Sequence, residues 1–139
     1  MVGIETSAKA VAMARLMAHG KPITIMKARG ESMKFANEFD IVFLGESLYT
    51  MKNKEKALSN CWRALKNPGT IAIIEGLLPK SKLNGAANQL IMGMQLDFAL
   101  QGQTFMNKKD IVLLLKNKFS KTRFEDLGGS VYLVTATKK

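Results

Sequence analysis

The side chain whose position best suggests chemistry in this sequence is the carboxylate of Glu5, which ends a short apolar segment and is followed by Thr6, Ser7 and a helical pattern. A carboxylate at the tip of a strand can accept hydrogen bonds from two ribose hydroxyls at once. Such a sugar-binding acid ordinarily follows a glycine-rich turn by about 20 residues. Counting back from Glu5 runs past Met1, so the sequence holds the sugar-binding candidate without that turn.

Other familiar kinds of site are not supported by the residue types present. With one histidine and one cysteine in the chain, a zinc site of the usual composition cannot be built, and we expect no metal. His19 lies beside Gly20 where a helix is predicted to stop, and no Ser-His-acid set can be named around it. No glycine run of the phosphate-cradling kind is present.

Length and composition predict one domain spanning residues 1–139. A chain of 139 residues with 47% hydrophobic content can bury one core, because a domain of this size hides roughly two-thirds of its unfolded surface. The single cysteine, Cys61, has no partner for an intramolecular disulfide, and the sequence has no signal-peptide pattern and no apolar run of about 18 residues. We therefore expect a cytoplasmic protein that does not span a membrane.

The formal net charge of +10 would attract polyanions. The lysines, however, are scattered through many segments instead of forming one basic block, and no nucleic-acid reading element is recognisable. We expect no nucleic-acid partner. RNA binding through the basic surface is a weaker alternative, which predicts an affinity that falls steeply with salt.

Apolar periodicity and turn residues predict alternating strands and helices. Ser7 is a candidate N-cap for a helix that ends before Gly20. Residues 39–44 form a near-continuous apolar run, typical of a central strand covered on both faces. Further strands are predicted over residues 23–28 and 70–76, helices over 54–66, 87–100 and from 107 or 108 onward, a connection over 79–85, a turn at 67–69, and a hairpin of residues 122–127 and 130–137 around Gly128-Gly129.

This order of elements predicts an α/β fold, a Rossmann-like, mostly parallel twisted sheet that ends in a C-terminal antiparallel hairpin. Right-handed crossovers between parallel strands would place helices on both faces of that sheet. No internal repeat, low-complexity stretch or linker divides the chain.

A series of motifs follows this order of elements. Glu5-Thr6-Ser7 with Ala14-Arg15 comes first, and the later ones are Phe39-Asp40-Ile41-Val42, Leu48-Tyr49, residues 64–69 (ALKNPG) and residues 73–79 (IIEGLLP). Together they resemble class I S-adenosylmethionine-dependent methyltransferases over nearly the whole chain. The motif over residues 73–79, the helical insert and the terminal hairpin are similar to the small-molecule O-methyltransferase branch. Where Tyr49 stands, the family often has histidine.

The resemblance implies S-adenosylmethionine as cofactor, bound at the carboxyl ends of the parallel strands. Glu5 and Thr6 would lie at the ribose, Arg29 and Gly30 match the adenine contacts, and the matches to the segment beside the methionine part are Gly45, Glu46 and Ser47. Arg29 departs from the pattern, because the family usually has an aspartate there that accepts a bond from the adenine amino group, and arginine can only donate. Glu31 could supply an acceptor, or Arg29 could stack on the base. No catalytic residue is assigned.

The resemblance lacks the family's first strand and glycine-rich loop, and the fold is therefore expected to be truncated at its N-terminus. In the family that strand lies between those matching residues 2–5 and 39–44, so its loss would leave backbone groups unpaired on both neighbours. The two neighbours could pair directly, a separate polypeptide could supply the missing part, or copies of the chain could associate. We favour self-association through the exposed sheet edges.

Two functions remain open. The first is the C-terminal part of an O-methyltransferase that acts on a small-molecule methyl acceptor. Whether this part is active on its own is left open by the sequence. The second is a non-catalytic relict or interaction module that keeps the fold without binding the cofactor. The absence of an obvious acid or base does not separate them, because positioning of the activated methyl group supplies most of the catalysis.

Overall fold

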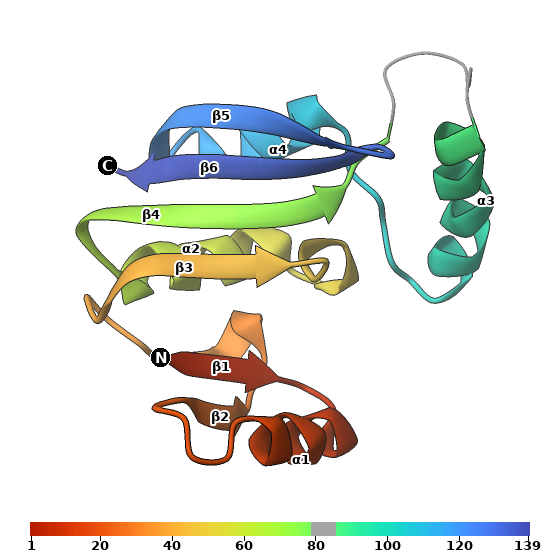
Figure 1. Cartoon of the computed structure of the whole chain (residues 1–139). Helices are drawn as coiled ribbons and strands as arrows, with labels where there is room; N and C mark the ends of the chain where they lie inside the picture. Colours follow the sequence, from red (N-terminus) through yellow and green to blue (C-terminus); the bar gives the residue numbers. More distant parts are fainter. Residues whose placement is uncertain (79–85) are drawn as a thin grey trace.

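The computed structural model describes residues 1–78 and 86–139, and within the helix that begins at residue 86 it leaves out the side chains of residues 86–88 and 90–92. The connection predicted over residues 79–85 lies outside this range. Strands and helices alternate as the sequence predicts (Figure 1). The elements are β1 (Val2–Glu5), α1 (Ala8–Met17), β2 (Thr24–Lys27), η1 (Gly30–Ser32), β3 (Phe39–Gly45), η2 (Leu48–Thr50), α2 (Lys54–Ala64), β4 (Leu65–Gly76), α3 (Ala86–Leu100), α4 (Lys108–Leu115), β5 (Phe119–Gly128) and β6 (Val131–Lys138).

The strands form two separate sheets. β1 and β2 pair in parallel and form the first sheet. The second sheet has the strand order β3-β4-β6-β5, in which β3 and β4 are parallel. β6 runs antiparallel to both of its neighbours, so the predicted C-terminal hairpin and the α/β class are confirmed. The division falls between β1 and β3, where the resemblance places the family's first strand, and the two strands do not pair directly. Figure 1 shows them side by side as neighbouring edges.

β3 is a strand as predicted, but its predicted central place is wrong. It forms one edge of the four-stranded sheet, and two of its apolar side chains are largely exposed, Ile41 at 65% and Phe43 at 59%. Val42 and Leu44 point the other way and pack against the core. The apolar run predicts a strand whose two faces are both buried by other elements. In the structure, no element of the described chain covers the outward face of β3.

Helices lie on one face of the four-stranded sheet, which corrects the expectation of helices on both. α2 and α4 contact each other, and both lie behind the strands in Figure 1. α1 packs instead against β1 and β2. Within the described residues, no helix covers the face that carries Ile41 and Phe43, consistent with their exposure.

The core lies between this sheet and its two helices. Ile71 and Ile73 of β4 are fully buried and belong to one cluster with Leu58 from α2 and with Ile111 and Leu115 from α4. Burying a side chain of this size contributes roughly 1.5 to 3 kcal/mol each. This packed layer fixes the strand ends that carry the candidate site. None of the described helices is long and apolar enough to cross a membrane.

Two predicted turns are displaced. The helix ends at Ala64 and β4 begins at Leu65, so the turn expected at residues 67–69 lies within β4, at a shift in its register with β3. The hairpin turn is formed by Gly129 and Ser130 instead of Gly128-Gly129. Both have positive φ, 60° and 64°, which is what a tight two-residue hairpin turn requires.

Candidate functional site

The carboxyl ends of the four parallel strands point toward one edge of the molecule. In Figure 1 the arrowheads of β1, β3 and β4 share one direction, and α3 stands beyond the end of β4. Open α/β sheets bind ligands at this edge. The residues that end or follow the strands are therefore the candidates for binding.

Glu5 ends β1, and its carboxylate is partly committed to the turn that follows. Its Oε1 accepts from the backbone N–H of Thr6 at 2.6 Å, from that of Ser7 at 2.8 Å and from the Thr6 hydroxyl at 3.2 Å. The bond from Ser7, with further help from Thr6, holds the pKa of Glu5 below its ordinary value. Oε2 accepts no hydrogen bond from the described residues, so one oxygen, with two lone pairs, stays available for ribose hydroxyls.

Ser7 is the N-cap of α1, as predicted, and its hydroxyl accepts from the N–H of Ala10 at 3.3 Å. Thr6 lies between Glu5 and this cap, and it is exposed. The cap and the Glu5 carboxylate together fix the first turn after β1.

Arg29 and Gly30 follow β2 and lie next to Glu5, because β1 and β2 are paired and the N–H of Ala28 donates to the Glu5 carbonyl at 3.0 Å. The Arg29 side chain is 56% exposed and lies 3.8 Å from a carboxylate oxygen of Glu31. The other Glu31 oxygen accepts from the N–H of Lys52 at 3.2 Å. Glu31 thus ties η1 to the segment before α2 through one oxygen, while its other oxygen accepts no hydrogen bond from the described residues.

The side chain of Asn60 also holds η1 in place. Its amide nitrogen donates to the carbonyl of Gly30 at 2.9 Å, and its oxygen accepts from Arg63, which also donates to the carbonyl of Met33. This network attaches the loop after β2 to α2, across the division between the two sheets. Together with the bond from Lys52 to Glu31, it links the two halves of the candidate site.

Gly45, Glu46 and Ser47 form the turn that follows β3. Glu46 has a φ of +44°, an uncommon conformation for a residue with a side chain, while its N–H still donates to the carbonyl of Ile74 at 2.8 Å. A Cβ atom on Gly45 would lie 2.9 Å from the ring of Phe43, so glycine lets that ring fold over the strand end. The Ser47 carbonyl accepts from the N–H and the hydroxyl of Thr50.

Glu75, near the end of β4, is a polar residue that the sequence did not single out as a site. Its side chain is fully buried, and Oε2 accepts from the N–H of Leu48 at 3.1 Å, whereas Oε1 has no partner among the described residues. Burial, with a further contribution from the negative charge of Glu46, raises the pKa of Glu75 to about 7. Its place at the end of an interior strand was the available signal.

An aromatic cluster connects η2 to α3. The rings of Tyr49, Phe98 and Phe105 lie with their centroids 5.2 Å apart in each pair. Burial, and then the charges of Glu46 and Glu75, raise the pKa of Tyr49. The cluster therefore places α3 against the turn that Glu75 holds.

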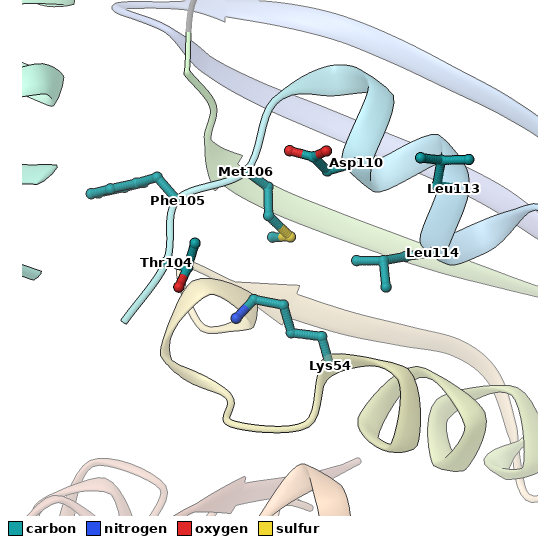
Figure 2. A pocket seen from close by; sticks show the side chains of 7 residues that line it. All are labelled: Lys54, Thr104, Phe105, Met106, Asp110, Leu113 and Leu114. Carbon is teal, nitrogen blue, oxygen red and sulfur yellow. The ribbon is translucent and has the colours of Figure 1, made fainter. Parts of the chain in front are cut away.

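A hollow of about 460 Å³ lies between the start of α2 and α4. Figure 2 shows Lys54 and Thr104 on one side of it, with Met106 and Leu114 facing them, while the ring of Phe105 points away. The lining residues are Lys54, Thr104, Phe105, Met106, Asp110, Leu113 and Leu114. Burial lowers the pKa of Lys54, whose Nζ donates to the carbonyls of Tyr49 and Met51. None of the predicted cofactor residues lines this hollow.

The predicted site residues thus fall into two groups. Strand pairing brings Glu5, Thr6, Arg29 and Gly30 together on the β1–β2 side. Gly45, Glu46 and Ser47 lie on the other side of the division, at the end of β3. No strand pairing joins the two groups within the described chain.

Solved structures with the same fold include proteins described as S-adenosylmethionine-dependent methyltransferases. The PH0226 protein of Pyrococcus horikoshii OT3 is 16% identical with a TM-score of 0.79, covering 100% of this chain and 73% of its own. The pyocyanin biosynthetic protein PhzM is 16% identical with a TM-score of 0.77, covering 99% and 42%. The N-methyltransferase NodS of Bradyrhizobium japonicum WM9, in complex with S-adenosyl-L-homocysteine, is 12% identical with a TM-score of 0.69, covering 99% and 65%. These TM-scores show a shared fold.

Residues 1–73 match the family model described as a methyltransferase domain. This is more than half of the chain, and the chain therefore belongs to the methyltransferase domain family. No curated protein matches it in sequence. The predicted resemblance to class I S-adenosylmethionine-dependent methyltransferases is confirmed, and S-adenosylmethionine is the cofactor that this resemblance assigns.

Proposed function

We propose that residues 1–139 form a single S-adenosylmethionine-binding domain of the small-molecule O-methyltransferase type, located in the cytoplasm. The observation that carries the proposal is the position of Glu5 at the carboxyl end of β1, with its Oε2 free of partners among the described residues. A lowered pKa keeps this carboxylate ionised at neutral pH, the form that accepts hydrogen bonds most strongly.

The predicted site residues would contact three different parts of the cofactor. Glu5 and Thr6 would hold the ribose, Arg29 and Gly30 would lie at the adenine, and Gly45 with its two neighbours would face the methionine part. Because arginine cannot accept a bond from the adenine amino group, Arg29 contributes by stacking its guanidinium on the base. When bound, the cofactor supplies an activated methyl group on a sulfonium. The chain then has to position the cofactor and the methyl acceptor and to exclude water.

A small-molecule acceptor with an oxygen nucleophile is supported by two features. The motif over residues 73–79 resembles that branch of the family, and α3 stands beyond the strand ends, where it can cap an acceptor. The cluster of Tyr49, Phe98 and Phe105 provides aromatic surface at this point. A small apolar acceptor suits such a wall.

A second candidate function is a non-catalytic module that keeps the fold without the cofactor. The division of the sheet between β1 and β3 favours it, because the two groups of candidate binding residues lie on opposite sides of that division. Arg29, which stands at the adenine position and cannot accept a bond from the amino group of the base, points the same way.

We further propose that copies of the chain associate through the open edges of β1 and β3. An unpaired edge strand exposes backbone N–H and C=O groups that can pair with another chain, and on β3 the exposed Ile41 and Phe43 add apolar surface. Charged residues that commonly protect such an edge are limited on this strand to Asp40, which Lys66 pairs at 3.1 Å.

Thermal unfolding with and without S-adenosylmethionine tests the proposed function. At about 100 times its Kd, a ligand that binds only the folded state stabilises it by about 2.7 kcal/mol, which for a domain of this size raises Tm by on the order of 8 °C. Methionine alone, which lacks the ribose and adenine, should leave Tm unchanged. An unchanged Tm at millimolar S-adenosylmethionine would favour the non-catalytic module.

A further inference from the structure

The buried carboxylate of Glu75 holds the turn that leads from β3 into η2. Its Oε2 accepts the N–H of Leu48 at 3.1 Å, two residues after Glu46. Its Oε1 is buried without a partner among the described residues. An ionised carboxylate in this position has one unsatisfied oxygen in a low-dielectric place, whereas a proton on Oε1 removes the charge and leaves Oε2 free to accept from Leu48.

The groups that face Glu75 do not neutralise it. Glu46, at the end of β3, adds a second negative charge, and Tyr49 of η2 is uncharged at neutral pH. Lys54 of α2 favours the ionised form, but its Nζ donates to two backbone carbonyls and makes no ion pair with Glu75. On β6 the cross-strand partner is Tyr132, whose ring lies under the ammonium group of Lys108 from α4. Burial and Glu46 together raise the pKa of Glu75 to about 7.

We propose that Glu75 is a proton-coupled counter-charge for a cationic group bound at the strand ends, so that binding of the cation expels a proton from Glu75 to solvent. A positive charge near a pair of carboxylates favours the ionised form of both. Glu75 holds the turn that contains Glu46 and Ser47. These two residues match the segment beside the methionine part of the cofactor. The inference rests on the proposed function, because it requires that S-adenosylmethionine binds there.

This coupling would let the site distinguish the methyl donor from its product. S-adenosylmethionine carries a positive sulfonium, which becomes a neutral thioether in S-adenosylhomocysteine when the methyl group leaves. With the positive charge gone, Glu75 regains its proton, and the extra affinity for the cation is lost. Glu75 acts here as a positioning residue, since it does not touch the reacting atoms.

The test compares the two ligands by isothermal titration at pH 6 and pH 7.5. For a single proton released from a group that titrates near 7, S-adenosylmethionine should bind about eightfold more tightly at the higher pH. The affinity for S-adenosylhomocysteine should change by less than about twofold. Titrations at one pH in phosphate and in Tris, which differ in ionisation enthalpy, should report proton release with the donor and not with the product.

The variant Glu75→Gln keeps the shape and an oxygen that can accept from Leu48, and it should bind S-adenosylmethionine with no pH dependence of this size. Glu55→Gln, which removes an exposed carboxylate in the first turn of α2, should keep the wild-type dependence. Equal pH dependence for the two ligands, or its persistence in Glu75→Gln, would overturn the inference alone. Failure of both ligands to bind wild-type protein at either pH would overturn the proposed function together with it.

Discussion

Replacing Glu5 with alanine is expected to weaken S-adenosylmethionine binding about 100-fold. A hydrogen bond to a charged group contributes about 1.5 to 3 kcal/mol, and two bonds from ribose hydroxyls to Oε2 would together contribute about 3 kcal/mol. Glu5 combines a strand-end position on β1 with a carboxylate oxygen that accepts no hydrogen bond from the described residues. Isothermal titration of wild type and variant measures the change directly.

Two further variants separate recognition from local structure. Glu5→Gln can keep the bonds from the N–H groups of Thr6 and Ser7 to its remaining oxygen, and it should lose affinity while α1 stays intact. Glu55→Gln removes the same charge from an exposed site on α2 and should bind as wild type does. Wild-type affinity in Glu5→Ala would exclude the ribose role.

Replacing Phe43 with lysine is expected to reduce the mass of the particle in solution from that of an oligomer to that of one chain. Phe43 is 59% exposed on the edge strand β3, so a charge at this position disrupts strand addition without opening the core. Gel filtration with light scattering gives the mass of each variant. A circular dichroism melt should show that the folded state is retained.

The opposite edge of the four-stranded sheet provides a matched control. Leu127 on β5 is 49% exposed, and Leu127→Lys places the same charge on the other edge strand. The mass should then remain that of the oligomer. A wild-type mass equal to one chain would refute self-association, and an equal effect of both variants would mean that β3 is not the specific contact.

The sequence predicted the order and type of the elements because apolar periodicity and turn residues report local burial. The helix after Ser7, the strand over residues 39–44 and the C-terminal hairpin are all present. What periodicity could not report was which neighbour covers an apolar strand. The outward side chains of β3 are as apolar as those of a central strand, but in the structure Ile41 and Phe43 face no described element.

The sequence predicted those candidate site residues that lie at the ends of strands. Glu5, Gly30 and Gly45 follow or end strands, and motif order alone locates them. The hydrogen bond from Lys52 to Glu31 joins residues 21 positions apart in the sequence, and no local pattern reveals it. Glu75 was missed as a site residue for a similar reason, since its burial and its bond to Leu48 arise only when β4 lies beside the turn after β3.

The most direct test of the central claim, that this chain binds S-adenosylmethionine at its strand ends, is isothermal titration of the wild-type protein. We expect saturable binding in the micromolar range, with one ligand bound per chain. No heat of binding at millimolar S-adenosylmethionine, with the protein shown to be folded, would contradict it and would leave the non-catalytic module as the function of this fold.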